Sequence, residues 1–313
     1  MARLKRIKLA HGLKTKHPVH LTLEWMAKRV SELSNEQLKV EIFPCEQLGN
    51  ENECLDALQR GYLGMTKTNT GPMEAFVPRI RIFGIPYLFR DGQHFWKVAL
   101  GPIGKALLLA AESEGFRGLC YYDAGARSFY SKKPISRPSD LKGKRVRVNN
   151  SVMAMEMITA MGGSPTPTSW GKLYMSLDQG VVEVAENNPP SFHTSHHYEV
   201  CKYFSMDEHM RLPDVLVVST KVWADLNDQQ QQWLQQAVDE SVAYGRELWD
   251  KEEKMSLAIM KKEGIKVLYP DKKPFVDAVK PLWNKFINAK DAEDMVIGKM
   301  IRQIREIGNS GTL

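Results

Sequence analysis

Several features that would assign a chain to a class of protein at once are missing from these 313 residues. No run of 18 or more apolar residues occurs, so the sequence predicts no membrane-spanning helix. The phosphate-binding motifs GxGxxG and GxxxxGK[ST] and the GxSxG motif of serine hydrolases are missing too. No acid, base and nucleophile follow one another in a recognisable order, so no residue pattern indicates an enzyme.

Dense clusters of positive charge are also missing, although the formal net charge is +6. Lysines and arginines are spread along the chain, whereas nucleic-acid-binding proteins gather them in a patch or a motif. Neither zinc-finger spacing nor a basic helix occurs, and the composition is that of a soluble globular protein, with 43% hydrophobic and 26% charged residues. We therefore expect no nucleic-acid partner, and this mild positive charge suits a protein that captures small anions.

Cysteine is scarce, and the chain lacks an obvious secretion signal. Cys45 and Cys54 lie nine residues apart around a turn-like EQLGNENE, so they can pair in an oxidising compartment, and free thiols are the alternative. The two others are Cys120 and Cys201, and no CxxC occurs. The basic start MARLKRIKLAHG lacks the apolar segment of a signal peptide, which leaves a cytoplasmic protein and a protein with its signal removed both open.

The length predicts about two domains of roughly 150 residues each. In the first part of the chain, segments with the period of a strand alternate with segments with the period of a helix, which predicts a mostly parallel sheet covered by helices. Ligands bind beyond the carboxyl ends of such strands, where residues 11–17 and 67–70 fall. The expected strands are 6–12, 38–44 and 65–71, and the expected helices are 17–34 and 52–61.

Strands and helices alternate again in the second part, so the predicted fold class is α/β throughout. A nearly unbroken helical pattern over residues 220–263 is too long for one small domain, and we expect it to run along both. The expected strands are a long one with its exit over 116–131, one preceded by a turn over 139–151, and 181–187 and 214–219. The expected helices are 151–163 and 171–180, and 164–170 is expected to be a loop.

Two arginines stand at ends of predicted strands in this second part. Arg147 lies in RVRVNNS and Arg127 follows YYDAGA. A guanidinium group is a planar fork that matches a carboxylate with two parallel hydrogen bonds. The pair therefore forms either a carboxylate clamp or ordinary surface charge, and spacing alone does not decide between them.

Two further groups of polar residues have alternative interpretations. Asn187 and Asn188 end a strand, where amides can bind sugar hydroxyls or form a turn. His193, His196 and His197 fall on one face of a possible helix, as metal ligands do. The glutamate of HExxH is missing, however, and two prolines precede the histidines, which favours capping or exposed histidines over a metal site.

Taken in order, these segments resemble the extracytoplasmic solute-binding proteins of tripartite ATP-independent periplasmic (TRAP) transporters, over Ile7 to about Phe286. Two positions depart from the pattern, Lys172 in place of Glu and Val184 in place of Gly. The shared segments are HPVH 17–20, PxxQLG 44–49, LQRG 58–61, PYLFRD 86–91, DLKGxxxRV 140–148, PTPxxWGxxYxxLxQGVVxxxEN 165–187 and YEVxKYF 198–204.

The resemblance implies a two-lobed flytrap with a hinge and a long helix spanning both lobes. Lobe I would comprise 1–123 plus about 213–250, and lobe II 124–212 plus about 251–313 with the spanning helices. It implies that Arg147 holds the ligand carboxylate with Arg127 as second arginine, while Arg145 faces solvent or a neighbour. The other expected binding residues are Asn187, Asn188, Lys67, Thr68, Asn69, His17, Glu208, His209 and Trp170, the last offering an apolar face to a sugar ring.

The resemblance also implies a function. The chain would capture a sugar acid such as glucuronate or galacturonate in the periplasm, with its signal removed, and deliver it to a membrane permease. We expect no cofactor, no metal and no enzymatic activity. The alternatives are a binding protein for another acid (a dicarboxylate, keto acid, sialic acid or sulfonate), a sugar-acid enzyme that uses the His193–His197 cluster, and a cytoplasmic sensor.

Overall fold

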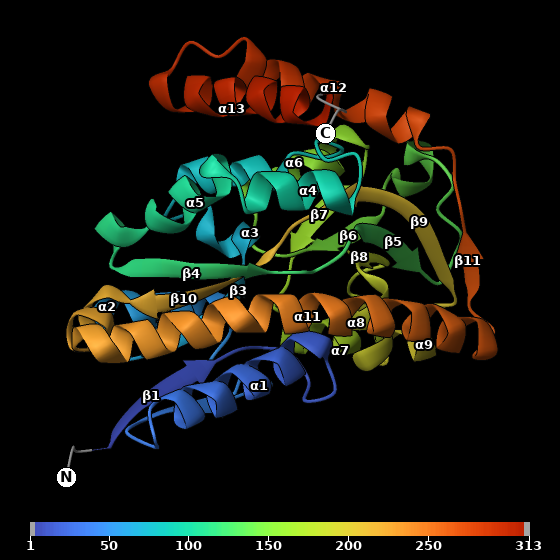
Figure 1. Ribbon diagram of the computed structural model, residues 1–313. Coiled ribbons are helices and arrows are strands. Elements are labelled where there is room, and N and C mark those ends of the chain that lie inside the picture. Colours follow the sequence, from blue (N-terminus) through green and yellow to red (C-terminus); the bar gives the residue numbers. More distant parts are fainter. Residues whose placement is uncertain (1–3, 310–313) are drawn as a thin grey trace. The chain divides into compact units, whose positions relative to one another are not determined.

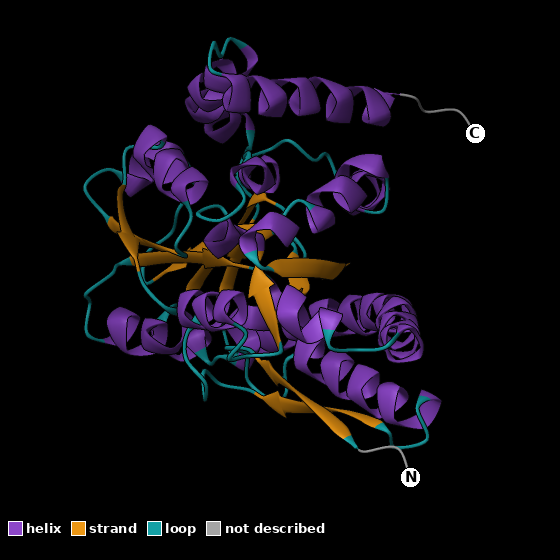
Figure 2. Cartoon of the chain, turned by 90° about the vertical axis from the view of Figure 1, so that its left-hand side faces the viewer, coloured by secondary structure: helices purple, strands orange, loops and turns teal. Residues whose placement is uncertain are grey.

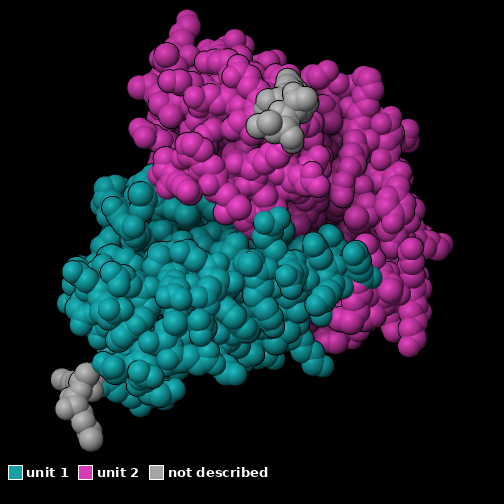
Figure 3. Space-filling view, viewed as in Figure 1, with its two compact units in different colours: residues 1–69, 107–123, 213–254 teal, residues 70–106, 124–212, 255–313 magenta. Residues whose placement is uncertain are grey.

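The computed structural model describes residues 4–309 (Figure 1). Two compact units share the chain, which passes from one to the other five times, after residues 69, 106, 123, 212 and 254 (Figure 3). Unit 1 comprises Met1–Asn69, Leu107–Asp123 and Pro213–Lys254, and unit 2 comprises Thr70–Ala106, Ala124–Leu212 and Met255–Leu313.

Unit 1 is built on a five-stranded sheet in the order β2-β1-β3-β10-β4. Strand β1 pairs in parallel with β2 and β3, as the alternating sequence pattern predicted, whereas β10 runs antiparallel to β3 and β4. The strands are β1 (Lys5–Ala10), β2 (Leu38–Phe43), β3 (Met65–Asn69), β4 (Phe116–Tyr122) and β10 (Asp214–Ser219). Pairing of Asp214 with Asn69 places the start of β10 beside the end of β3.

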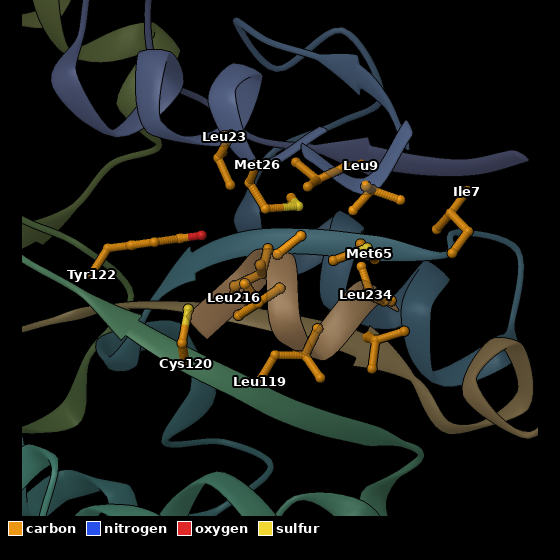
Figure 4. Close-up of a cluster of buried hydrophobic side chains, with 14 of the residues drawn as sticks. Ile7, Leu9, Leu23, Met26, Met65, Leu119, Cys120, Tyr122, Leu216 and Leu234 are labelled. Atoms are coloured by element: carbon orange, nitrogen blue, oxygen red, sulfur yellow. The ribbon is translucent and has the colours of Figure 1, made fainter. Parts of the chain in front are cut away.

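The helices of unit 1 bury apolar stripes against this sheet. Leu23 and Met26 of α1 are fully buried in a core that Leu9, Met65 and Leu216 of the sheet share (Figure 4). An Asn50–Glu53 capping box starts α2, and Gly61 ends it in the left-handed conformation that glycine adopts without strain. Besides the long helix described below, the helical segments that lie wholly in unit 1 are α1 (Pro18–Leu33), α2 (Glu51–Arg60), α10 (Thr220–Ala224) and the short η2 (Glu112–Glu114).

Unit 2 contains a six-stranded sheet in the order β11-β9-β5-β8-β6-β7. Neighbours β6 and β8 are parallel, while β5 runs antiparallel to both β8 and β9. The strands are β5 (Arg127–Ser131), β6 (Arg145–Val148), β7 (Ser164–Pro167), β8 (Val184–Asn187), β9 (Tyr203–Met210) and β11 (Lys266–Leu268).

Two sequence predictions are corrected in these sheets. The single strand expected over 116–131 is two strands, because β4 belongs to the sheet of unit 1 and β5 to that of unit 2. The loop expected over 164–170 includes β7, which pairs in parallel with β6. The prolines at 165 and 167 fit because β7 is an edge strand, where a missing N–H breaks no ladder.

Helical segments connect the strands of unit 2, and Figure 2 distinguishes helices, strands and loops by colour. At its C-terminal end α12 packs on α13, and Gly298 is needed there because a Cβ atom would lie 2.3 Å from the carbonyl oxygen of Phe286. The helical segments are α3 (Thr70–Met73), η1 (Pro78–Gly84), α4 (Gly92–Ala99), η3 (Pro138–Leu141), α6 (Val152–Ala160), η4 (Trp170–Lys172), α7 (Leu173–Asp178), α8 (Pro189–Thr194), α9 (His197–Val200), α12 (Lys273–Ile287) and α13 (Ala292–Asn309), and α5 (Pro102–Leu109) lies across the boundary.

Residues 70–106 belong to unit 2 in this structure, whereas the sequence analysis assigned them to lobe I. The reason is packing, since η1 contacts α3, α6 and α13, and α4 also contacts α13. The ring of His94 on α4 lies 2.9 Å from the carbonyl oxygen of Ile304. Strand periodicity carries no information about which sheet such short helices cover.

The long helix predicted over residues 220–263 is confirmed, with an interruption. The short α10 ends at Ala224, and α11 then runs over Asp228–Lys262 without a break. Its 35 residues extend about 52 Å at the usual rise and continue from unit 1 into unit 2 (Figure 1). Over residues 4–309, neither this helix nor any other is long and apolar enough to cross a membrane.

Candidate functional site

One edge of the sheet in unit 2 gathers most of the predicted binding residues of that half. Strand β5 runs antiparallel to β8, so Arg127 at its start lies next to Asn187 at the end of β8. Arg147 lies near the carboxyl end of β6, which is parallel to β8 and therefore ends at the same edge. Met210 pairs with Arg127, which brings the preceding His209 to the same region.

Arg127 is held by a buried carboxylate that the sequence analysis did not include in the site. Its Nε donates to Oε2 of Glu186, and its Nη2 donates to Oε1 of the same carboxylate over 2.8 Å. Both side chains are almost fully buried. Burial would raise the pKa of Glu186, but the charges of Arg127 and His209 outweigh it and lower the pKa to about 2.

A buried network continues from this ion pair. His209 places Nδ1 2.8 Å from Asp207 and Nε2 3.4 Å from Glu186. Asp207 also accepts hydrogen bonds from the backbone N–H of Phe129 and from the hydroxyl of Tyr87. Burial alone would lower the pKa of His209, but the two carboxylates raise it to about 9, so the ring is protonated at neutral pH. The sequence analysis missed Asp207 and Tyr87.

Arg147 is buried and held by other means. Its Nε and Nη2 both donate to the carbonyl oxygen of Thr168, over 2.9 and 2.8 Å, and its guanidinium carbon lies 5.5 Å from the centre of the Trp170 ring. Trp170 also contacts the ring of His197 edge-on, and Nδ1 of His197 lies 2.9 Å from the Tyr130 hydroxyl. Burial and the charge of Arg147 lower the pKa of His197 to about 3, so this histidine is neutral.

Polar residues also gather at the end of β3 in unit 1. Buried Lys67 places its Nζ 3.0 Å from Asp214 and 3.9 Å from Glu51. Asn69 donates its backbone N–H to Glu51, and the Thr68 hydroxyl donates to the carbonyl oxygen of Asn69. Strand pairing explains the contact with Asp214, which the sequence analysis could not predict because 147 residues separate it from Lys67.

Buried neutral histidines accompany Lys67. His17 caps α1 by accepting the backbone N–H of Val19 at Nδ1, which leaves the proton of the neutral ring on Nε2. His11 accepts the N–H of Leu13 at Nδ1, and its Nε2 lies 3.0 Å from His20. Burial, followed by the charge of Lys67, lowers the pKa of His17 and that of His11, the latter to about 3.

Other predicted residues are engaged elsewhere. Asn188 caps α8 by accepting from Ser191 and donates to the carbonyl oxygen of Ala124, so it fixes the turn after β8. Glu208 forms an ion pair with Lys272 at the surface. The three histidines at 193–197 contact Ser256, Tyr198 and Tyr130 respectively. Over residues 4–309, no group of three or more histidine, cysteine or acidic residues is arranged to hold a metal ion.

All four cysteines are free thiols in the structure, so the possible Cys45–Cys54 disulfide is not formed. Cys45 is exposed, whereas Cys54 is buried against the carbonyl oxygen of Gly49. Burial raises the pKa of the Cys54 thiol to about 11.

Two α/β units, repeated chain crossings and a long helix shared by both units are the features of a two-lobed solute-binding protein. The chain belongs to the bacterial extracellular solute-binding proteins, family 7, whose sequence profile matches residues 9–290. It is a solute-binding protein of a TRAP transporter, and the two-lobed fold that the resemblance implied is confirmed.

Curated relatives and solved structures agree with this family. An uncharacterised protein of Salmonella typhimurium, YiiZ, is 36% identical over 90% of this chain and 87% of its own length. The sialic acid-binding periplasmic protein SiaP of Vibrio cholerae is 29% identical over 83% of this chain and 82% of its own.

Three solved structures are TRAP periplasmic solute-binding proteins with a uronate bound. The protein from Bradyrhizobium sp. BTAi1, with galacturonate, has a TM-score of 0.91 at 36% identity and covers 96% of this chain and 100% of its own. The protein from Xanthobacter autotrophicus Py2, also with galacturonate, has a TM-score of 0.90 at 34% identity, over 95% and 99%. The protein from Roseobacter denitrificans, with glucuronate, has a TM-score of 0.90 at 28% identity, over 98% and 99%.

Proposed function

We propose that this chain captures a hexuronate, D-galacturonate or D-glucuronate, and that Arg147 holds the ligand carboxylate. The observation that carries the proposal is the gathering of Arg147, Arg127 and Asn187 at one buried sheet edge. A buried guanidinium already fixed by a carbonyl oxygen and an aromatic ring has little side-chain freedom left to lose on binding. The uronates bound by the similar TRAP proteins support the same ligand class.

The charges of the unit 2 cluster favour one carboxylate. Arg127, Arg147 and protonated His209 are cations, and Glu186 and Asp207 are anions, so these five groups carry one net positive charge. A single carboxylate neutralises that charge. Because a desolvated ion pair is favourable only when its charges are compensated, a monoacid suits the cluster better than a neutral sugar does.

The polar residues at the end of β3 suit hydroxyl groups of a ligand better than a second acidic group. Two carboxylates, Asp214 and Glu51, already face Lys67, so this cation is not available for a second acidic group of a ligand. The neighbouring His17, Thr68 and Asn69 are neutral donors and acceptors. We infer that polyhydroxylated acids bind in preference to dicarboxylates, because His17, Thr68 and Asn69 can form hydrogen bonds with hydroxyl groups.

The transport role completes the proposal. A ligand that contacts both lobes biases a hinge equilibrium towards the closed form, which is the form we propose a TRAP membrane permease recognises. We propose that the chain works in the periplasm and releases its ligand unchanged. Incubating the protein with a uronate and recording its proton NMR spectrum tests this, because a new product would indicate an enzyme instead.

The decisive experiment is isothermal titration calorimetry with Arg147→Ala and a matched control, Arg145→Ala. Both arginines lie on β6, but Arg145 is exposed and bonds to Val181 and Glu183 at the surface. A micromolar dissociation constant corresponds to about −8 kcal/mol. Two charge-assisted hydrogen bonds supply roughly 3–6 kcal/mol of that, so Arg147→Ala should weaken binding at least about 100-fold.

The wild type and Arg145→Ala should bind galacturonate or glucuronate and should not bind the neutral parent sugars. Normal binding by a folded Arg147→Ala would refute the proposed clamp. Binding of dicarboxylates or keto acids alone would keep the transport role and reject the uronate.

A further inference from the structure

Glu74 is a buried carboxylate that has no place in the site described above. It lies just after α3, with 6% of its surface exposed. Its Oε1 accepts a hydrogen bond from the Ser151 hydroxyl over 2.6 Å, and its Oε2 accepts the backbone N–H of Met153 over 3.2 Å. Ser151 is the N-cap of α6 and accepts the N–H of Ala154. Glu74 therefore completes the cap of the helix that begins five residues after Arg147.

Two glycines show how closely the Glu74 segment approaches this loop. A Cβ atom on Gly71 would lie 2.4 Å from the amide nitrogen of Asn149 and 3.0 Å from Cβ of Ser151. A Cβ atom on Gly84 would lie 2.9 Å from Cβ of Met153. Residues 70–84 thus fit around the 149–153 loop at two points besides the carboxylate, so the contact is an extended and specific one.

Burying this acid costs free energy. Burial outweighs the hydrogen bonds from Ser151, Met153 and Val152 and the charge of Arg81, and raises the pKa of Glu74 to about 7. A glutamine of the same shape would avoid that cost, and strongly perturbed acids are more frequent at functional sites than elsewhere.

The position of the segment in the chain gives the contact a role. Residues 67–69 end β3 of unit 1, and residue 70 begins unit 2. Residues 149–153, which comprise the loop after β6 and the first residues of α6, begin two residues after Arg147. The Glu74 carboxylate therefore joins the segment that continues from Lys67, Thr68 and Asn69 to the segment that follows Arg147.

We propose that Glu74 is a positioning residue for ligand binding, whose carboxylate fixes the 149–153 loop and so orients Arg147. This inference rests on the proposed binding of a carboxylate by Arg147. It predicts that loss of the carboxylate weakens ligand binding by more than its effect on folding explains.

The test compares the affinity for D-galacturonate, by calorimetry, of the wild type, Glu74→Ala, Glu74→Gln and Asp91→Ala. The last is a matched control, because Asp91 caps α4 in the same unit by accepting the N–H of His94 over 2.7 Å. Both alanine variants lose helix caps and should lose comparable thermal stability. Glu74→Ala should bind roughly tenfold or more weakly, Glu74→Gln should recover part of that loss through its amide oxygen, and Asp91→Ala should bind as the wild type does.

A double-mutant cycle with Arg147→Lys separates positioning from general destabilisation. If Glu74 acts through Arg147, the effect of Glu74→Ala on affinity should shrink in the Arg147→Lys background, whereas independent effects would multiply. The inference would be wrong if Glu74→Gln and Glu74→Ala bound galacturonate as tightly as the wild type, or if Asp91→Ala lost as much affinity as Glu74→Ala. Either result would leave the proposed function intact. Absence of binding in the wild type would reject the proposed function and this inference with it.

Discussion

The Arg127–Glu186 ion pair offers the sharpest prediction about stability. Both side chains are almost fully buried, and two parallel hydrogen bonds join them. Truncating one partner of such a pair leaves the other charge buried and uncompensated, which costs about 3–5 kcal/mol. At about 2–4 °C per kcal/mol for a domain of this size, Glu186→Ala should lower the melting temperature by roughly 6–20 °C.

The matched variant removes both charges. Replacing a buried ion pair by apolar residues of similar volume is often neutral or stabilising. Glu186→Leu combined with Arg127→Met should therefore recover much of the stability that Glu186→Leu alone loses, although His209 then keeps only Asp207 as an ionic partner.

Urea denaturation followed by circular dichroism measures Glu186→Ala, Glu186→Leu, Arg127→Met and the double variant. A coupling energy of several kcal/mol between the two substitutions would support a desolvated pair. A cost below about 1 kcal/mol for Glu186→Ala would refute the reasoning, because that is the range of pairs exposed to water.

Two further predictions concern other contacts. The pKa of His209 is raised from 6.5 to about 9 in the folded protein, so its contribution to stability is complete below pH 6.5 and is lost as the pH rises to about 9. Urea denaturation across that window should show a loss of up to about 3 kcal/mol in the free energy of unfolding. The His209→Asn variant should not show this pH dependence. Gly61→Ala should lower stability by about 1 kcal/mol, because this residue ends α2 with φ +81°. The matched control Ala57→Gly lies inside α2 and should cost about 1 kcal/mol through helix propensity, with no left-handed strain. A Gly61→Ala variant as stable as the wild type would contradict the capping argument.

Local sequence patterns predicted the positions of helices and strands better than they predicted which strands pair with one another. The period of two in 38–43 and 145–148 marks β2 and β6, and the helical stripe of 18–33 marks α1. The sheet to which β4 and β5 belong depends on pairing between residues far apart in sequence, which one chain's pattern does not encode. Strand β7 was missed because its two prolines suggest a loop unless its edge position is known.

The candidate site shows the same division. Strand-end logic and the resemblance to the TRAP family together indicated Arg127, Arg147 and Asn187, and the structure places all three at one sheet edge. The carboxylates that pair with Arg127 and His209 were not predicted, although Glu186 precedes Asn187 directly. An acidic residue in a strand is expected to face solvent unless the residues of the neighbouring strand are known.

These two carboxylates change the role that we expect of each arginine. The sequence analysis expected Arg127 to be a second cation that binds the ligand. In the structure, two of its N–H groups already donate to the carboxylate of Glu186. We therefore propose that Arg127 contributes less to ligand binding than an unpaired second cation would, and that it acts partly through the rigidity that the ion pair confers. Arg147 instead donates to the neutral carbonyl oxygen of Thr168 and lies over the Trp170 ring. We therefore expect alanine substitution of Arg147 to act mainly on affinity, and alanine substitution of Arg127 to act on affinity and stability together.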